Sequence, residues 1–217
     1  MTQIDLVAFH REWTRFESWL TTHSPSDQAA LQRPAGRERQ AELESRLGFA
    51  LHPELKALLD LHDGVAESVA VPSPRVGRPA GSFLPLQHQL CSVDDIAMMY
   101  DVLVEVSEDF IEAGSADDEE ADEEELAANL HRCVPFALPN DGGVALIDHR
   151  PGPSYGHVYE MGIGSGDLDG TFWATGLTEL FRALCDALET GTPFLHYWPT
   201  NFKDQLGRGS LEWEIRA

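Results

Sequence analysis

The sequence predicts an α+β domain in which helices pack mainly on one face of an antiparallel-rich sheet. Two observations lead to this prediction. Apolar residues recur at helical spacing through the first half of the chain, whereas residues 133–174 hold short β-prone runs separated by Pro, Gly, Asn and Asp. One more periodic segment follows these runs, and a group of helices before a group of strands is typical of α+β architecture.

The first expected helix covers residues 4–21. Phe9, Trp13, Phe16 and Leu20 recur there at helical spacing, so they form one aromatic and apolar stripe. Such a stripe belongs to a hydrophobic core more often than to a cofactor site. We therefore expect this helix to pack its stripe against the rest of the domain.

Two shorter helices are expected next. One follows Pro34 and ends at Gly48, because glycine is favoured where a helix stops. The other begins at Pro53, since proline suits the first helical position, and closes at Gly64. The two helices are joined by the residues from Gly48 to His52.

A loop and a long helix come after them. Residues 72–81 contain three prolines and two glycines, which predicts a loop, and a short strand is expected at Phe83–Leu86. Ser92 and Asp95 then resemble a capping box in which Asp replaces Glu. They begin a helix whose apolar stripe continues to Phe110.

The second half of the chain predicts a meander of antiparallel strands. Its four expected strands cover residues 133–137, 144–148, 156–161 and 171–174. A last helix is expected from Leu177 to Leu188, with Gly191 at its end.

The charge is strongly negative and unevenly distributed. The chain holds 37 acidic and 15 basic residues, for a formal net charge of −22. No Lys or Arg occurs between Pro79 and His131. The densest acidic run consists of Asp117, Asp118, Glu119, Glu120, Asp122, Glu123, Glu124 and Glu125. This run is either a solvated loop or helix turn, or a partner-binding surface that attracts a cationic protein.

Composition excludes several partners and compartments. A field of this sign repels nucleic acid and anionic membranes, so we expect neither as a partner. No apolar stretch approaches the about 20 residues of a membrane helix, and the N-terminus lacks the pattern of a signal peptide. Cys91, Cys133 and Cys185 are too widely spaced for a disulfide framework or a zinc motif. We expect reduced thiols and a cytoplasmic location.

One motif matches a hydrolase pattern in sequence but not in context. Gly152–Gly156 satisfies G-x-S-x-G, and Ser154, Asp186 and His196 occur in the order of a catalytic triad. A nucleophile elbow needs a helix directly after the serine, whereas residues 157–161 alternate like a strand. We therefore expect no catalytic residues, and a serine hydrolase using Ser154 is a remote alternative.

The motifs that could bind a metal or a cofactor are also incomplete. Asp148, His149 and His157 could cluster across a hairpin, but no third nitrogen or thiolate ligand stands at a fixed spacing. The glycines at 162–166 do not complete a dinucleotide fingerprint, and residues 167–170 lack the glutamate of a calcium loop. We expect no metal and no cofactor.

The order of these segments resembles the SUKH superfamily. The resemblance opens with a helix ending at Gly48, a turn at Leu51–Pro53, a second helix and a polar stop at His62–Gly64. The further stretches that carry it are Phe83–Leu86, Ser92–Ile96, Val134–Ala137, Asp141–Gly143, Leu146–Asp148, Pro151–Pro153 and Gly156–Val158. The motifs are individually weak and specific only together.

The resemblance implies a SUKH-like domain at 34–191 that contains an acidic insertion at 113–125. Residues 1–33 would then form a helical extension, and residues 192–217 a further extension packed on the domain. Bacterial proteins of this superfamily are similar to immunity proteins that neutralise polymorphic toxins, often nucleases, and a fungal branch regulates cell-wall and glucan synthesis. The resemblance therefore implies a protein-binding module of the immunity type, or alternatively a regulatory scaffold, with no catalytic residues.

Overall fold

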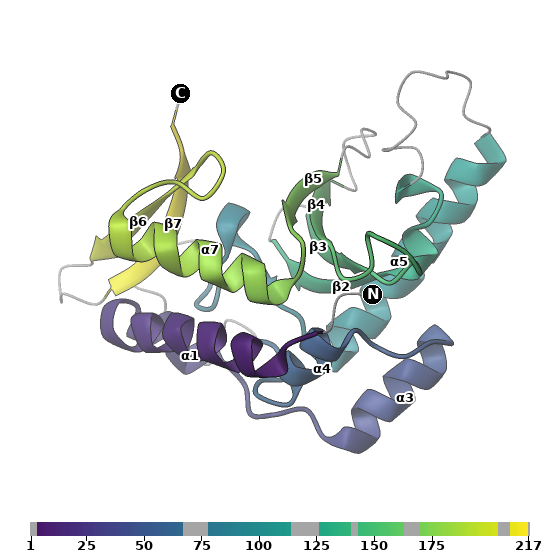
Figure 1. Ribbon diagram of the computed structural model, residues 1–217, viewed down its shortest axis with the longest axis horizontal. Helices are drawn as coiled ribbons and strands as arrows, with labels where there is room; N and C mark the ends of the chain where they lie inside the picture. The colour runs from purple at the N-terminus through teal and green to yellow at the C-terminus, as the bar shows by residue number, and fades with distance from the viewer. Residues whose placement is uncertain are drawn as a thin grey trace.

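The protein folds into helices around a five-stranded sheet, with a separate hairpin at one side (Figure 1). The computed structural model describes residues 4–66, 78–113, 126–139, 143–162, 170–203 and 209–216. This architecture confirms the predicted α+β class. None of the helices in these ranges is long and apolar enough to cross a membrane.

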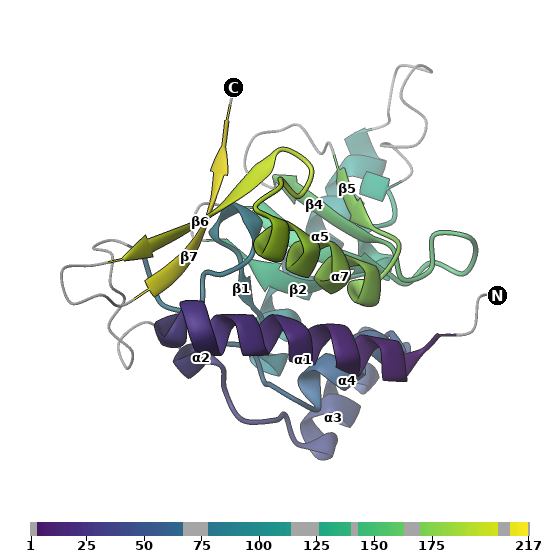
Figure 2. The same ribbon diagram turned by 60° about the vertical axis from the view of Figure 1, so that its left-hand side comes forward.

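Helix α1 (Leu6–His23) forms as predicted and buries its aromatic stripe. The Asp5 carboxylate accepts hydrogen bonds from the backbone N–H groups of Val7 (3.0 Å) and Ala8 (3.1 Å), which fixes the helix start. Figure 2 shows α1 lying alongside α7 (Leu177–Thr190), and Trp13 meets Phe181 of that helix with ring centroids 4.8 Å apart. The two helices therefore share one aromatic core.

Three short helices follow α1: α2 (Pro25–Ala30), α3 (Arg37–Leu47) and α4 (Pro53–Leu59). Helix α2 was not predicted, because six residues carry too little periodicity. Helix α3 ends at Gly48 as expected. The predicted end of α4 at Gly64 is wrong, since the helix stops at Leu59.

Gly64 has a different role from the one predicted. It adopts a left-handed backbone conformation (φ 70°), and a Cβ atom there would lie 2.4 Å from the backbone nitrogen of Ser92. The glycine is required by this close approach of two chain segments, and not by the end of a helix.

The five-stranded sheet is the predicted antiparallel meander. Its strands, in spatial and chain order, are β1 (Gln89–Leu90), β2 (Cys133–Leu138), β3 (Gly143–Asp148), β4 (Val158–Gly162) and β5 (Thr171–Ala174). The strand predicted at Phe83–Leu86 is wrong. Pro85 begins a short 3₁₀ helix, η1 (Pro85–Gln87), in which Leu86 has a positive φ of 55°. The first strand instead pairs at Gln89 and Leu90 with β2.

Both faces of the sheet are covered. Val134, Ile147 and Val158 belong to the main core, together with α1, α4 and α7. On the other face, Val144 and Leu146 pack in a smaller cluster with residues of α5 (Val93–Ala113) and of the short 3₁₀ helix η2 (Leu130–Arg132). Most helices thus lie on one face, as predicted, and α5 covers the other.

The capping box of α5 is present as the sequence predicted. The Asp95 carboxylate accepts from the backbone N–H of Ser92 (2.9 Å), and the Ser92 hydroxyl oxygen accepts from the backbone N–H of Asp95 (3.2 Å). Each residue thus satisfies a donor of the other at the helix start.

A hairpin of β6 (Tyr197–Lys203) and β7 (Gly209–Ile215) ends the described chain and was not predicted. It packs beside α2 and η1, and the Trp213 indole donates a hydrogen bond to the carbonyl oxygen of Phe83 (2.9 Å). Leu211 is fully buried in the main core. The predicted division into a central domain and two extensions stays a prediction. Residues of α1 and β7, which would belong to the two extensions, are both part of the main core.

The three cysteines are buried free thiols. Burial raises the pKa of each thiol above its ordinary value. A thiol held in its protonated form is a poor nucleophile and a poor metal ligand.

Candidate functional site

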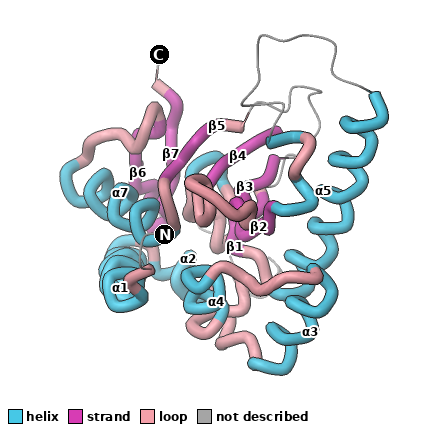
Figure 3. The backbone as a smooth tube through the Cα atoms, turned by 45° about the vertical axis from the view of Figure 1, so that its right-hand side comes forward, coloured by secondary structure: helices cyan, strands magenta, loops and turns pink. Residues whose placement is uncertain are grey.

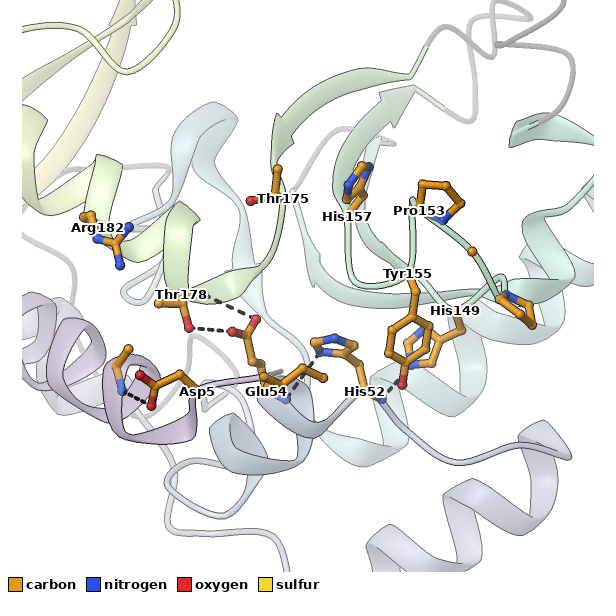
Figure 4. Close-up of a pocket in the computed structure, with 14 residues that line it drawn as sticks. Asp5, His52, Glu54, His149, Pro153, Tyr155, His157, Thr175, Thr178 and Arg182 are labelled. Carbon is orange, nitrogen blue, oxygen red and sulfur yellow. Dashed lines mark hydrogen bonds between the residues drawn. The ribbon is translucent and has the colours of Figure 1, made fainter. Parts of the chain in front are cut away.

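A pocket of about 1060 Å³ lies where the first turns of α1, α4 and α7 meet the connection between β3 and β4 (Figure 4). Its lining residues are Ile4, Asp5, Ala8, His52, Glu54, His149, Pro151, Gly152, Pro153, Tyr155, His157, Thr175, Thr178 and Arg182. Four segments that are far apart in the sequence therefore build this site.

His52 lies among these residues, between Glu54 and Tyr155 (Figure 4), and is only 3% exposed. Its Nδ1 atom accepts a hydrogen bond from the backbone N–H of Glu54 (3.3 Å), so His52 caps the start of α4. This bond leaves the ring proton on Nε2. Burial lowers the pKa of His52 to about 4, so the ring is neutral at pH 7.

The β3–β4 connection passes directly against this ring. Gly156 has a positive φ of 92°, and a Cβ atom there would lie 2.6 Å from Nε2 of His52. The aromatic ring of Tyr155 lies 4.9 Å from the His52 ring, centroid to centroid. Only glycine fits at position 156, because any larger side chain would prevent the loop from lying this close to α4.

His149 fastens the same loop to α4. Its Nε2 accepts from the backbone N–H of His52 (2.8 Å), and its Nδ1 therefore carries the proton and donates to the carbonyl oxygen of Ile147 (2.9 Å). Burial lowers the pKa of His149 to about 4. Both nitrogens of this neutral ring are thus occupied by backbone partners.

The Glu54 carboxylate occupies the start of α7. It accepts hydrogen bonds from the backbone N–H of Leu177 (2.8 Å) and from the hydroxyl of Thr178 (2.5 Å). Gly176, the residue before the helix, has no side chain to cap it, and a Cβ atom there would lie 2.9 Å from the Glu54 carboxylate. A residue from α4 therefore supplies the cap that the local sequence of α7 lacks.

Replacement of Glu54 by alanine is expected to lower the free energy of unfolding by about 2 kcal/mol, because it removes both the cap and a negative charge at the positive end of α7. Urea denaturation measures this loss. The control is Glu179→Ala in the first turn of the same helix, where the carboxylate is exposed and pairs with Arg182. We expect less than about 1 kcal/mol there, and equal losses in the two variants would refute the capping role.

The sequence predicts no metal site at Asp148, His149 and His157, and these side chains make other contacts. The Asp148 carboxylate is buried and binds the guanidinium of Arg150 (Nη2 to Oδ2, 2.7 Å), while both nitrogens of His149 are occupied. Within the described ranges, no three His, Cys, Asp or Glu side chains are grouped closely enough to hold a metal ion. Of the other candidates, Gly162 ends β4 and Gly170 precedes β5, and residues 163–169 lie outside the described part of the chain.

The three residues in triad order also lie apart. Ser154 lies in the β3–β4 connection, which a strand follows instead of the helix that an elbow requires. The Asp186 carboxylate pairs with Arg15 (2.8 Å), and the ring of His196 lies against Tyr197 beyond the end of α7. The expected strand directly after the motif is confirmed, since β4 begins at Val158.

The acidic run from Asp117 to Glu125 lies outside the described residues. The described helix before it is also acidic, and the exposed carboxylates of α5 are Asp94, Asp101, Glu105, Glu108, Asp109 and Glu112. Of these six carboxylates, Asp94 pairs with Arg39 (2.9 Å) and Asp101 with Arg46 (2.5 Å), and the other four form no ion pair with a described residue. The last turns of α5 are thus acidic and carry no basic residue, although the helix dipole favours cations there.

Sequence reasoning missed the pocket. The only local signal is Pro53, which marks the start of α4 and so places His52 at a capping position. Nothing in the sequence indicates that Glu54 reaches Leu177, more than a hundred residues away.

These elements define a class of protein: an α+β domain with helices around an antiparallel meander and a pocket at the start of α4. The chain belongs to the SMI1 / KNR4 family (SUKH-1), whose match covers residues 34–182. This match confirms the resemblance to the SUKH superfamily and ends within α7. No curated protein matches the chain.

Proposed function

We propose that this protein is a binding module of the immunity type that neutralises a cationic toxin in the cytoplasm without itself catalysing a reaction. The observation that carries the proposal is the exposed acidic surface of α5. Membership of the SMI1 / KNR4 family supports a protein partner, because domains of this family are protein-interaction modules. The net charge of −22 favours a partner of opposite sign.

Helix α5 is shaped for contact with a partner. It has 21 residues, so it is about 31 Å long, and its C-terminal half extends away from the other helices (Figure 3). Met98 and Ile111 are 59% and 58% exposed between the carboxylates. Apolar side chains within a charged surface are typical of an interface that combines steering with burial.

The chemistry of a nuclease fits this surface. Such an enzyme holds phosphate groups with Lys and Arg side chains, and a row of carboxylates competes for the same cations. A module that covers these cations with α5 would block substrate binding. The acidic run from Asp117 to Glu125 adds eight carboxylates to the sequence shortly after α5.

Removal of three charges from α5 is expected to slow binding of a cationic toxin. In the variant Glu105→Gln, Glu108→Gln, Glu112→Gln, the association rate at low salt should fall about tenfold, because electrostatic steering accelerates encounter. Stopped-flow measurements at several salt concentrations test this. The matched control changes the exposed residues Glu38, Glu42 and Glu214 to Gln, so that its net charge equals that of the α5 variant. Equal rates in the two variants would refute a role for this face.

A growth assay tests the biological role. The chain is co-produced with cationic nuclease toxin domains, beginning with any that is encoded beside its gene, and we expect one of them to give restored growth and a stable one-to-one complex. The alternative, a regulatory scaffold in cell-wall or glucan synthesis, is the one to adopt if no toxin is neutralised and the protein instead binds synthesis enzymes. Labelling by a fluorophosphonate that is lost in Ser154→Ala would favour the remote hydrolase alternative.

A further inference from the structure

The β3–β4 connection (residues 149–157) is attached to the start of α4 through two histidine rings (Figure 4). Among the described residues, one hydrogen bond joins the two segments, and in it Nε2 of His149 accepts from the backbone N–H of His52 (2.8 Å). The backbone of Gly156 and the ring of Tyr155 also pack against the His52 ring. Both rings therefore lie in the contact between the connection and the helix.

Each ring uses an unprotonated nitrogen as an acceptor in this contact. Nε2 of His149 faces the backbone N–H of His52, and Nδ1 of His52 faces the backbone N–H of Glu54 (3.3 Å). A second proton on either ring would replace the acceptor by a donor, so that two N–H groups would face each other. Both hydrogen bonds would then be lost, and protonation of the rings therefore opposes the attachment of the connection to α4.

The charged groups around the rings do not offset a positive charge there. The titratable and charged side chains that surround the two rings are Glu54 of α4, Tyr155, His157, Asp148 and Arg150 in or beside the connection, Asp5 before α1, Arg182 of α7 and Arg132 of η2. The three carboxylates among them already bind the start of α7, the start of α1 and the guanidinium of Arg150. Burial has the largest influence and lowers the pKa of each ring to about 4, although Asp148 acts in the opposite direction at His149.

The connection has further hydrogen bonds that involve neither ring. The backbone N–H of Gly156 donates to the carbonyl oxygen of Asp148 (2.8 Å), and the backbone N–H of His149 donates to the carbonyl oxygen of Arg132 (2.8 Å). The Asp148 carboxylate accepts from the backbone N–H of Arg150 (2.7 Å). These bonds would hold the connection on the sheet after its contact with α4 is lost.

We propose that the β3–β4 connection is a pH-sensitive switch, in which protonation of His52 and His149 releases the connection from α4 and opens the pocket while the sheet stays folded. At neutral pH both rings are acceptors and the switch is closed. In the open state the rings are exposed to water and bind protons with their ordinary pKa of 6.5. Opening is therefore favoured increasingly as the pH falls below 6.5, and the effect levels off below pH 4.

The size of the effect follows from the two pKa values of each ring. A change from about 4 in the closed state to 6.5 in the open state raises the equilibrium constant for opening about 20-fold per ring between pH 7 and pH 5. For both rings together the increase is about 400-fold. This inference goes beyond the proposed function, since it needs no partner.

Amide hydrogen exchange at pH 7, 6 and 5, followed by NMR at low urea concentrations, tests the switch. The protection factors of the His52 and Glu54 amides should fall about 400-fold from pH 7 to pH 5. Their exchange should not depend on urea, because local opening exposes little surface. The Gly156 amide, which is bonded within the connection, should stay more protected than these two, and the amides of β3 should exchange only through urea-dependent unfolding.

Two variants separate the contributions of the rings. In His149→Gln the side-chain oxygen takes the place of Nε2 as acceptor, and in His52→Asn it takes the place of Nδ1, so each variant keeps an acceptor that does not titrate. Each should retain only about 20-fold of the pH effect, and the double variant should retain none. The control His196→Gln changes an exposed ring and should behave like the wild type. Urea unfolding at pH 7 shows that each variant is folded.

Three results would overturn the proposal. The first is exchange of the His52 and Glu54 amides only through urea-dependent unfolding at pH 5. The second is a protection factor of these amides that is the same at pH 7 and pH 5. The third is a full pH effect in both His149→Gln and His52→Asn. If a variant does not fold, the first two measurements on the wild-type protein decide.

Discussion

Replacement of Asp27 by alanine is expected to lower the free energy of unfolding by about 3–5 kcal/mol, because it leaves a buried cation unpaired. Asp27 is fully buried on α2, and its carboxylate accepts from the backbone N–H groups of Gly81 (2.9 Å) and Leu211 (3.1 Å). The guanidinium of Arg78, itself 5% exposed, lies 3.5 Å from the same carboxylate. One side chain therefore joins α2, the segment before η1 and β7.

Urea denaturation followed by circular dichroism measures the loss. The control is Asp109→Ala on the exposed side of α5, which should change stability by less than about 0.5 kcal/mol. Adding Arg78→Met to Asp27→Ala should recover part of the loss, since it removes the unpaired charge. A loss below about 1 kcal/mol for Asp27→Ala alone would contradict the role of this carboxylate.

Acidification from pH 7 to pH 5 is expected to lower the free energy of unfolding by several kcal/mol. The pKa values of His52 and His149 fall from the ordinary 6.5 to about 4 in the folded protein. The unfolded chain therefore binds more protons between pH 6.5 and 4, and stability decreases as the pH falls through this range. A shift of this size corresponds to about 2 kcal/mol for each ring at pH 5.

Urea denaturation at pH 7, 6 and 5 tests this dependence. The variant His52→Asn cannot titrate at that position and should lose only about half as much stability as the wild type. His196→Gln, which changes an exposed ring, should follow the wild-type profile. An unchanged pH dependence in His52→Asn would show that this ring is not held neutral by burial.

Much of the fold could be predicted because its elements are marked locally. Neighbouring residues alone indicate where these helices form, begin or end. Examples are the apolar stripe in α1, the cap of α5 at Ser92 and Gly48 at the end of α3. The meander from β2 to β5 was found for the same reason. Short β-prone runs between turn residues pair with their neighbours in the chain.

The errors arose where distant contacts override local preference. Phe83 and Leu84 are apolar enough for a strand, but they are buried beside η1, and Phe83 binds Trp213 through its backbone. The β6–β7 hairpin was missed because its strands mix Pro, Asn and Lys with aromatic residues. Its stability comes from packing on α2, which no local pattern reports.

The sequence by itself determined the family, the helices with long apolar stripes, the meander and the strongly negative charge, since each depends on residue type and short-range spacing. Only the tertiary structure decided the pocket. His52, Glu54 and Gly156 acquire their roles from groups about 100 or more residues away. Hydrogen bonds across such separations leave no periodic trace in a sequence, because any of many donors and acceptors could have formed them.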